Sequence, residues 1–109
     1  MVALSGKTAL VTGAASGIGE GMAIRLAESG ANLALCDLQE TIHDVAGRIA
    51  EETGAQIHAD AVDVRDPDQI FEFVDGANSH FSGLDIVIAN AGIWRSTDPV
   101  EDTQEKTVA

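Results

Sequence analysis

The sequence is poor in basic residues, in cysteine and in long apolar runs. Six lysines and arginines stand against 18 aspartates and glutamates, which gives a formal net charge of −12 at pH 7. An acidic surface of this kind repels phosphate backbones and anionic lipids, so we expect neither nucleic acid nor a membrane surface as a partner. A dinucleotide is not excluded, because a buried site presents backbone N–H groups to a phosphate whatever the net charge.

The single cysteine, Cys36, excludes a disulfide within the chain and fits a reducing compartment. No apolar run approaches the roughly 20 residues that are needed to cross a bilayer. Residues 1–7 hold no apolar run behind a basic start, so we expect no signal peptide and a cytoplasmic location. The histidines are scattered without metal-ligand spacing, so we expect no metal site. They are His43, His58 and His80.

Four short aliphatic runs alternate with stretches of helical periodicity. The runs cover residues 8–12, 33–36, 57–64 and 84–89, and short runs that are apolar on both faces are typical of buried parallel strands. The order β-α-β-α-β-α-β predicts an α/β fold with a parallel sheet, right-handed crossovers and helices on both faces.

The three predicted helices each show an apolar stripe followed by a glycine, at Gly30, Gly54 and Gly83. The third begins with Asp66 as its N-cap, and Gln69 is placed for a capping box. The stripes are Ile18, Met22 and Leu26; Ile42, Val45, Ala46 and Ile49; and Ile70, Val74, Ala77 and Phe81.

A glycine-rich turn joins the first predicted strand to the first predicted helix. Its glycines are Gly13, Gly17 and Gly19, in the spacing Gly-x-x-x-Gly-x-Gly. Glycines here permit a tight turn and close approach of a ligand, and the helix N-terminus offers unpaired N–H groups to a pyrophosphate. Taken alone, the motif also fits a tight turn that only packs the helix closely.

An acidic residue, Asp37, ends the second run. A carboxylate at that point accepts hydrogen bonds from ribose hydroxyls and repels a 2′-phosphate, and no Arg or Lys stands near it in the sequence. This favours NAD over NADP. The alternative is a solvated carboxylate at the end of a strand.

Four separated motifs, each at the end of a strand, together resemble the short-chain dehydrogenase/reductase family. They are the glycine turn of residues 12–19, Asp37, Asp63-Val64 and Asn90-Ala91-Gly92. The resemblance covers about residues 4–100 and implies a Rossmann-type doubly wound parallel sheet of strand order 3-2-1-4, truncated after the fourth strand. We expect residues 1–92 to form this partial dinucleotide-binding domain, and residues 93–109 a loop and an incomplete helix.

The same resemblance implies an NAD site. The pyrophosphate and the adjoining ribose would contact the turn, the adenosine ribose would contact Asp37 and its neighbour, and the adenine edge would meet the third strand's end. The motif after the fourth strand would line the floor, although a purely structural role for Asn90 stays open. The residues are Gly13, Ser16, Gly17, Ile18, Gly19, Asp37, Leu38, Asp63, Val64, Asn90, Ala91 and Gly92.

The catalytic set that the resemblance implies is missing from these residues. Family members transfer a hydride between a nicotinamide and an alcohol or carbonyl, using a serine, a tyrosine and a lysine that lowers the tyrosine's pKa. This sequence contains no tyrosine. We therefore expect no catalytic residue and no turnover by this chain alone, and no family-type oligomer interface. Two alternatives stay open: a non-catalytic module that binds adenine dinucleotides, and an interaction fragment that completes its sheet with a partner chain through the exposed fourth strand.

Overall fold

The structure, a computed structural model, describes residues 3–90 of the chain. The strands form one parallel sheet of order β3-β2-β1-β4, which confirms the predicted α/β class and strand order. In the described part, no helix is both long and apolar enough to span a membrane. The predicted boundary at 92–93 and the predicted tail lie outside the described residues. The elements are β1 (Thr8–Thr12), α1 (Gly17–Glu28), β2 (Asn32–Asp37), α2 (Ile42–Thr53), β3 (Ile57–Ala61), α3 (Pro67–Phe81) and β4 (Ile86–Ala89).

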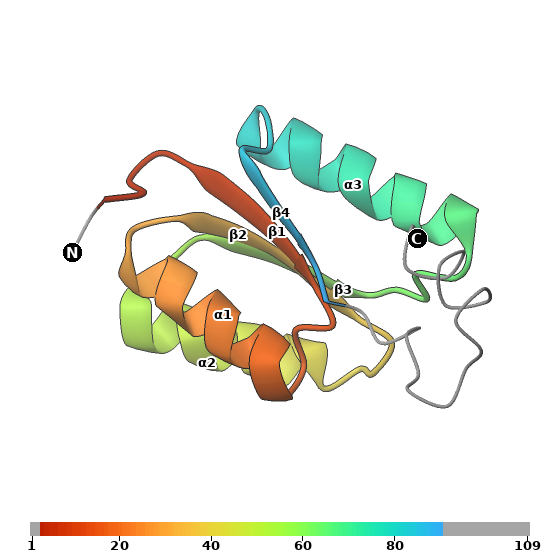
Figure 1. Cartoon of the computed structure of the whole chain (residues 1–109), viewed down its shortest axis with the longest axis horizontal. Coiled ribbons are helices and arrows are strands. Elements are labelled where there is room, and N and C mark those ends of the chain that lie inside the picture. The colour runs from red at the N-terminus through yellow and green to blue at the C-terminus, as the bar shows by residue number, and fades with distance from the viewer. Residues whose placement is uncertain (1–2, 91–109) are drawn as a thin grey trace, which may run out of the picture.

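The sheet is covered on both faces, with α1 and α2 on one side and α3 on the other (Figure 1). Successive side chains of β2 belong to two separate cores. Leu33 and Leu35 pack in the cluster that holds α1 and α2, whereas Ala34 and Cys36 pack in the cluster that holds α3. Because successive side chains of a strand point to opposite faces, a strand covered on both sides must be apolar throughout.

Helix α2 follows its predicted pattern. All four residues of its apolar stripe are buried, and Gly54 ends the helix with φ of 79°, a left-handed conformation that suits glycine. In α3, the carboxylate of Asp66 accepts a hydrogen bond from the N–H of Asp68, as expected of an N-cap. The predicted capping box is wrong, because the Gln69 side-chain oxygen accepts from the N–H of Asp63 instead.

The predicted apolar stripe of α1 is not its buried face. Ile18 is 74% exposed and Met22 36% exposed, while the buried residues of α1 are Gly19, Ala23 and Ala27. Small side chains let the helix axis approach the strands closely, so the face with the least bulk packs against the sheet. The larger residues are left on the flank of α1 that faces β4.

The two outer strands are less buried than the sequence pattern predicts. Every residue of β1 is buried, but β3 and β4 are only half-buried, and Val87 of β4 is 64% exposed. Both are edges of the sheet formed by the described residues, so each has a neighbouring strand on one side only. The third strand also ends at Ala61, before the predicted limit at Val64.

Candidate functional site

The glycine loop connects the carboxyl end of β1 to the N-terminus of α1. Gly13 and Gly17 have φ of 66° and 61°, values that side chains disfavour. Ser16 precedes the helix in extended conformation, and its side chain makes no capping hydrogen bond. Since the first amides of a helix have no partner within it, the loop and the start of α1 offer backbone N–H groups to an anion.

Gly19 and Asn90 hold the loop against the end of β4. A Cβ built on Gly19 would lie 2.0 Å from the carbonyl oxygen of Gly13 and 2.7 Å from Nδ2 of Asn90. Asn90 donates from its backbone N to Oγ1 of Thr12 at 2.9 Å and from Nδ2 to the Gly13 carbonyl at 3.4 Å. These two hydrogen bonds give Asn90 a structural role, because they join the end of β4 to the glycine loop.

Asp37 joins the end of β2 to the same loop. Its Oδ2 accepts a hydrogen bond from the N–H of Ala15 at 3.0 Å, and its Oδ1 accepts one from the N–H of Gln39 at 3.0 Å. A parallel bond runs from the N–H of Ala14 to the carbonyl of Cys36 at 3.2 Å. The carboxylate is thus built into the loop and is not merely a solvated group at the end of a strand.

Asp63 lies beyond the end of β3 and is engaged by Arg65. Nε and a terminal nitrogen of Arg65 donate to the two oxygens of Asp63, each at 3.0 Å. These hydrogen bonds lower the pKa of Asp63 below its ordinary value. The N–H of Val62 donates to the carbonyl of Asp37 at 2.8 Å, which ties this segment to the end of β2.

The predicted site residues thus gather at the carboxyl edge of the sheet, with differing exposure. Ser16 and Gly17 are exposed, Leu38 is 63% exposed, and Val64 is half-buried in the cluster beneath α3. Hydrogen bonds connect the loop directly to Asp37 and Asn90, whereas Asp63 is linked to them only through the backbone. Ala91 and Gly92 lie outside the described residues. No group of three or more His, Cys, Asp or Glu within residues 3–90 is placed to hold a metal ion.

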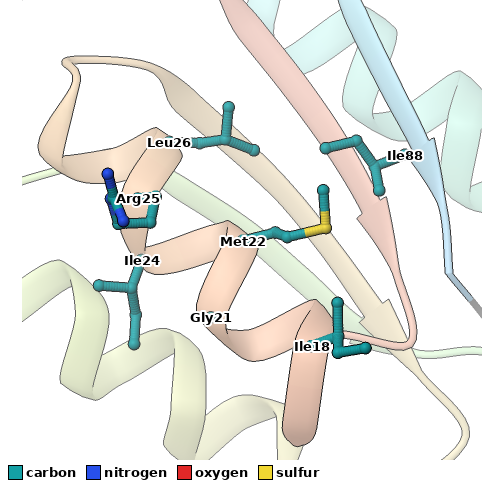
Figure 2. A pocket seen from close by; sticks show the side chains of 7 residues that line it. All are labelled: Ile18, Gly21, Met22, Ile24, Arg25, Leu26 and Ile88. Atoms are coloured by element: carbon teal, nitrogen blue, oxygen red, sulfur yellow. The ribbon is translucent and has the colours of Figure 1, made fainter.

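An open hollow of about 610 Å³ lies beside this edge, between α1 and β4. Ile18, Met22 and Leu26 project from α1 on the side of Ile88, which lies across the hollow on β4 (Figure 2). Its lining is mainly aliphatic and touches the glycine loop only through Ile18. The hollow is therefore an uncovered apolar surface and is separate from the polar groups of the loop.

Three contributors to the site escaped prediction from the sequence. Ala15 acts through its backbone N–H, and a backbone amide leaves no mark in the residue type. Thr12, the last residue of β1, supplies a hydroxyl oxygen that accepts from the N–H of Asn90. Arg65 could have been found, because an arginine two residues after an aspartate is within reach of its carboxylate.

Backbone amides at a helix N-terminus, next to a carboxylate that ends the adjacent parallel strand, define the class of dinucleotide-binding α/β folds. Residues 7–109 match the family model described as short chain dehydrogenase. The chain belongs to the short-chain dehydrogenase family.

Individual relatives agree with this assignment. The chain is 41% identical over 92 residues to oxidoreductase UcpA of Escherichia coli K12, covering 84% of this chain and 35% of that protein. It is 38% identical over 100 residues to the short chain dehydrogenase/reductase dpmpG of Macrophomina phaseolina, covering 91% of this chain and 57% of that protein. The chain therefore spans roughly a third to three-fifths of the length of these relatives.

Two solved structures share the fold. L-sorbose reductase from Gluconobacter frateurii, complexed with NADPH and L-sorbose, aligns with a TM-score of 0.81 at 35% identity, over 96% of this chain and 40% of that chain. A short chain dehydrogenase from Mycobacterium paratuberculosis, bound to NAD, aligns with a TM-score of 0.79 at 30% identity, over 92% of this chain and 41% of that chain.

Proposed function

We propose that the chain is the NAD-binding portion of a short-chain dehydrogenase/reductase whose complete form transfers a hydride between NAD and an alcohol or carbonyl substrate. The observation that carries the proposal is the junction of the glycine loop with Asp37, because it places anion-binding amides beside a carboxylate that suits a ribose. Both solved relatives described above hold a nicotinamide dinucleotide.

Each part of the dinucleotide has its own residues in this proposal. The loop and the start of α1 bind the pyrophosphate, residues 37–38 the adenosine ribose, residues 63–64 the adenine edge, and the segment after β4 the floor of the site. The Asp63 carboxylate can accept from an amino group, and its hydrogen bonds with Arg65, which lower its pKa, extend the charged form to lower pH. The proposed set is Gly13, Ser16, Gly17, Ile18, Gly19, Asp37, Leu38, Asp63, Val64, Asn90, Ala91 and Gly92.

NAD is the proposed cofactor in preference to NADP. A 2′-phosphate on the adenosine ribose would stand next to the Asp37 carboxylate, and like charges at close range are unfavourable. The solved relatives include one with NADPH and one with NAD, so the preference rests on Asp37 alone. Because these 109 residues contain no tyrosine, we expect no turnover without residues from outside the chain.

Thermal unfolding of the full chain with NAD, NADP or ADP-ribose tests the proposal. A ligand at about 100 times its Kd stabilises the folded state by about 2.7 kcal/mol. We expect NAD and ADP-ribose to raise the Tm, and NADP to raise it less. Asp37→Asn should reduce the difference between the Tm with NAD and the Tm with NADP. Asp75 is an exposed carboxylate on α3, so Asp75→Asn should leave that difference unchanged. An unchanged Tm with all three ligands would contradict the proposal.

A second candidate function is that β4 is completed by a strand of another polypeptide chain. The observation in its favour is that β4 pairs with β1 alone among the described strands, while Val87 is 64% exposed and the hollow beside α1 is apolar. An unpaired edge of this kind is a template for strand addition. Sedimentation over a concentration series should then show a defined complex that Val87→Lys weakens, and a clean monomer at high concentration would rule out self-association through β4.

A further inference from the structure

The Asp37 carboxylate makes its hydrogen bonds within the protein to two backbone amides that come from different segments. The N–H of Gln39 is two residues along the same chain segment, whereas the N–H of Ala15 belongs to the glycine loop, 22 residues earlier. Both distances are 3.0 Å. Hydrogen bonds to an ionised acceptor are the stronger kind, so the contact with Ala15 is a firm link between β2 and the loop.

The loop requires such a link because its own backbone is permissive. Gly13 and Gly17, which flank Ala15, have positive φ, and glycine has the widest choice of backbone conformations. Asn90 holds the loop at the Gly13 carbonyl through a longer bond of 3.4 Å, and the N–H of Ala14 donates to the carbonyl of Cys36 at 3.2 Å. The Asp37–Ala15 bond adds a charged side-chain contact to the backbone bond of Ala14, and the two together hold the middle of the loop, between Gly13 and Gly17.

The carboxylate still has capacity to bind a ligand. An ionised carboxylate offers about four lone-pair sites, and the two amides occupy one on each oxygen. One site on each oxygen is left, which matches the two adjacent hydroxyls of a ribose. Two internal hydrogen bonds also hold the carboxylate in one orientation before any ligand arrives, which reduces the entropy lost on binding.

We propose that Asp37 is a positioning residue for the glycine loop: through the N–H of Ala15 it sets the loop in its pyrophosphate-binding shape, in addition to accepting the ribose hydroxyls. This inference rests on the proposed function for its ligand, but the loop contact itself is a property of the free protein. A loss of NAD binding in an Asp37 variant would combine the loss of the loop contact with the loss of the ribose contact. The loop contact can be measured separately, without NAD.

Amide hydrogen exchange in the ligand-free full chain reads the loop contact directly. In Asp37→Ala we expect exchange at Ala15 to accelerate by roughly tenfold, the effect of losing one charge-assisted hydrogen bond. Amides of β2 such as Leu35 should be unchanged, which excludes global unfolding. Asp37→Asn keeps one oxygen that can accept from Ala15, so it should restore part of the protection. Unchanged exchange at Ala15 in Asp37→Ala would overturn the proposal.

Titration with inorganic pyrophosphate, which has no ribose, tests the consequence for the loop. Removing a negative charge near an anion should by itself strengthen binding. If Asp37 positions the loop, Asp37→Ala binds pyrophosphate more weakly than the wild type, and Asp37→Asn recovers part of the loss. Equal or tighter binding by Asp37→Ala would leave Asp37 as a ribose acceptor only and overturn the proposal. Failure of the wild type to bind NAD, with Ala15 still protected by Asp37, would contradict the proposed function and not the loop contact.

Discussion

Gly17 and Gly19 are both required in the loop, but for different physical reasons. Gly17 has a φ of 61° with nothing within 4 Å of the place where a Cβ would stand, so its conformation alone selects glycine. Gly19 has no such conformation, and it is selected by the lack of space beside Gly13 and Asn90. The second constraint brings the start of α1 close to the strand ends.

Gly19→Ala should therefore destabilise the protein. The Cβ would overlap the Gly13 carbonyl, a backbone group that cannot rotate away, so α1 must shift, at a cost of about 1–3 kcal/mol. Gly21→Ala, in the same helix with nothing within 4 Å, is the matched control and should be neutral or stabilise by about 0.5–1 kcal/mol. Urea unfolding of the two variants measures the difference. Equal urea midpoints for the two variants would show that α1 accommodates a Cβ at position 19 without loss of stability.

Much of the site could be predicted from the sequence because its residues end strands. Parallel strands bring their carboxyl ends to one edge, so the glycine turn, Asp37 and Asn90 were expected to meet there, and hydrogen bonds connect all three. The contact of Asp37 with Ala15 could not be predicted, since every non-proline residue carries a backbone N–H. The positions of single hydrogen bonds depend on loop geometry that periodicity does not encode.

At the level of the elements, α1 and α2 show what an apolar stripe can and cannot predict. Both helices were expected, and both are present. In α2 the stripe is the buried face, because it is the only apolar face of the helix. In α1 there are two apolar faces, one of small and one of large residues, and the small one packs on the sheet. A hydropathy pattern ranks the larger side chains first and so selects the wrong face.

Matched isoleucine truncations distinguish these two faces. Ile49 of α2 is fully buried, so Ile49→Ala should reduce the free energy of unfolding by about 2–5 kcal/mol. Ile18 of α1 is 74% exposed, so Ile18→Ala should change it by no more than about 0.5 kcal/mol. Chemical denaturation of both variants under the same conditions provides the comparison. A large loss in Ile18→Ala would mean that another chain or segment covers α1 in solution.

For the molecule as a whole, the centre of the described sheet is better covered than its β4 edge. Every residue of β1 and the four inner residues of β2 are buried, while β4 has an exposed Val87 and borders the hollow lined by Met22 and Ile88. The chain matches 40% of the length of L-sorbose reductase while 96% of its own length aligns. The chain thus spans less than half of that relative, and the stability of the described sheet should depend mainly on its β1–β2 centre.

Cys36 reports on the stability of that centre. It is fully buried in β2, and burial, followed by the nearby charges of Asp37 and Asp60, raises the pKa of its thiol from 9.0 to about 12. Well below pH 9 the thiol is neutral in both the folded and the unfolded states. Between the ordinary pKa of 9.0 and the folded pKa of about 12, the unfolded chain loses this proton while the folded chain keeps it. The free energy of unfolding must therefore fall as pH rises through this window.

The wild type and Cys36→Ala should consequently respond differently to alkaline pH. Between about pH 8 and about pH 10 the wild type should lose about 1.4 kcal/mol more than the variant, the value for one proton held one pH unit above its unfolded pKa. Urea unfolding at the two pH values gives the four free energies that are needed. The other titrating groups are common to both proteins. Any cavity cost of the substitution is the same at both pH values, so the difference between the two losses isolates the thiol. Equal losses of unfolding free energy in the two proteins would mean that water reaches Cys36 in the folded protein, through local opening of the sheet centre.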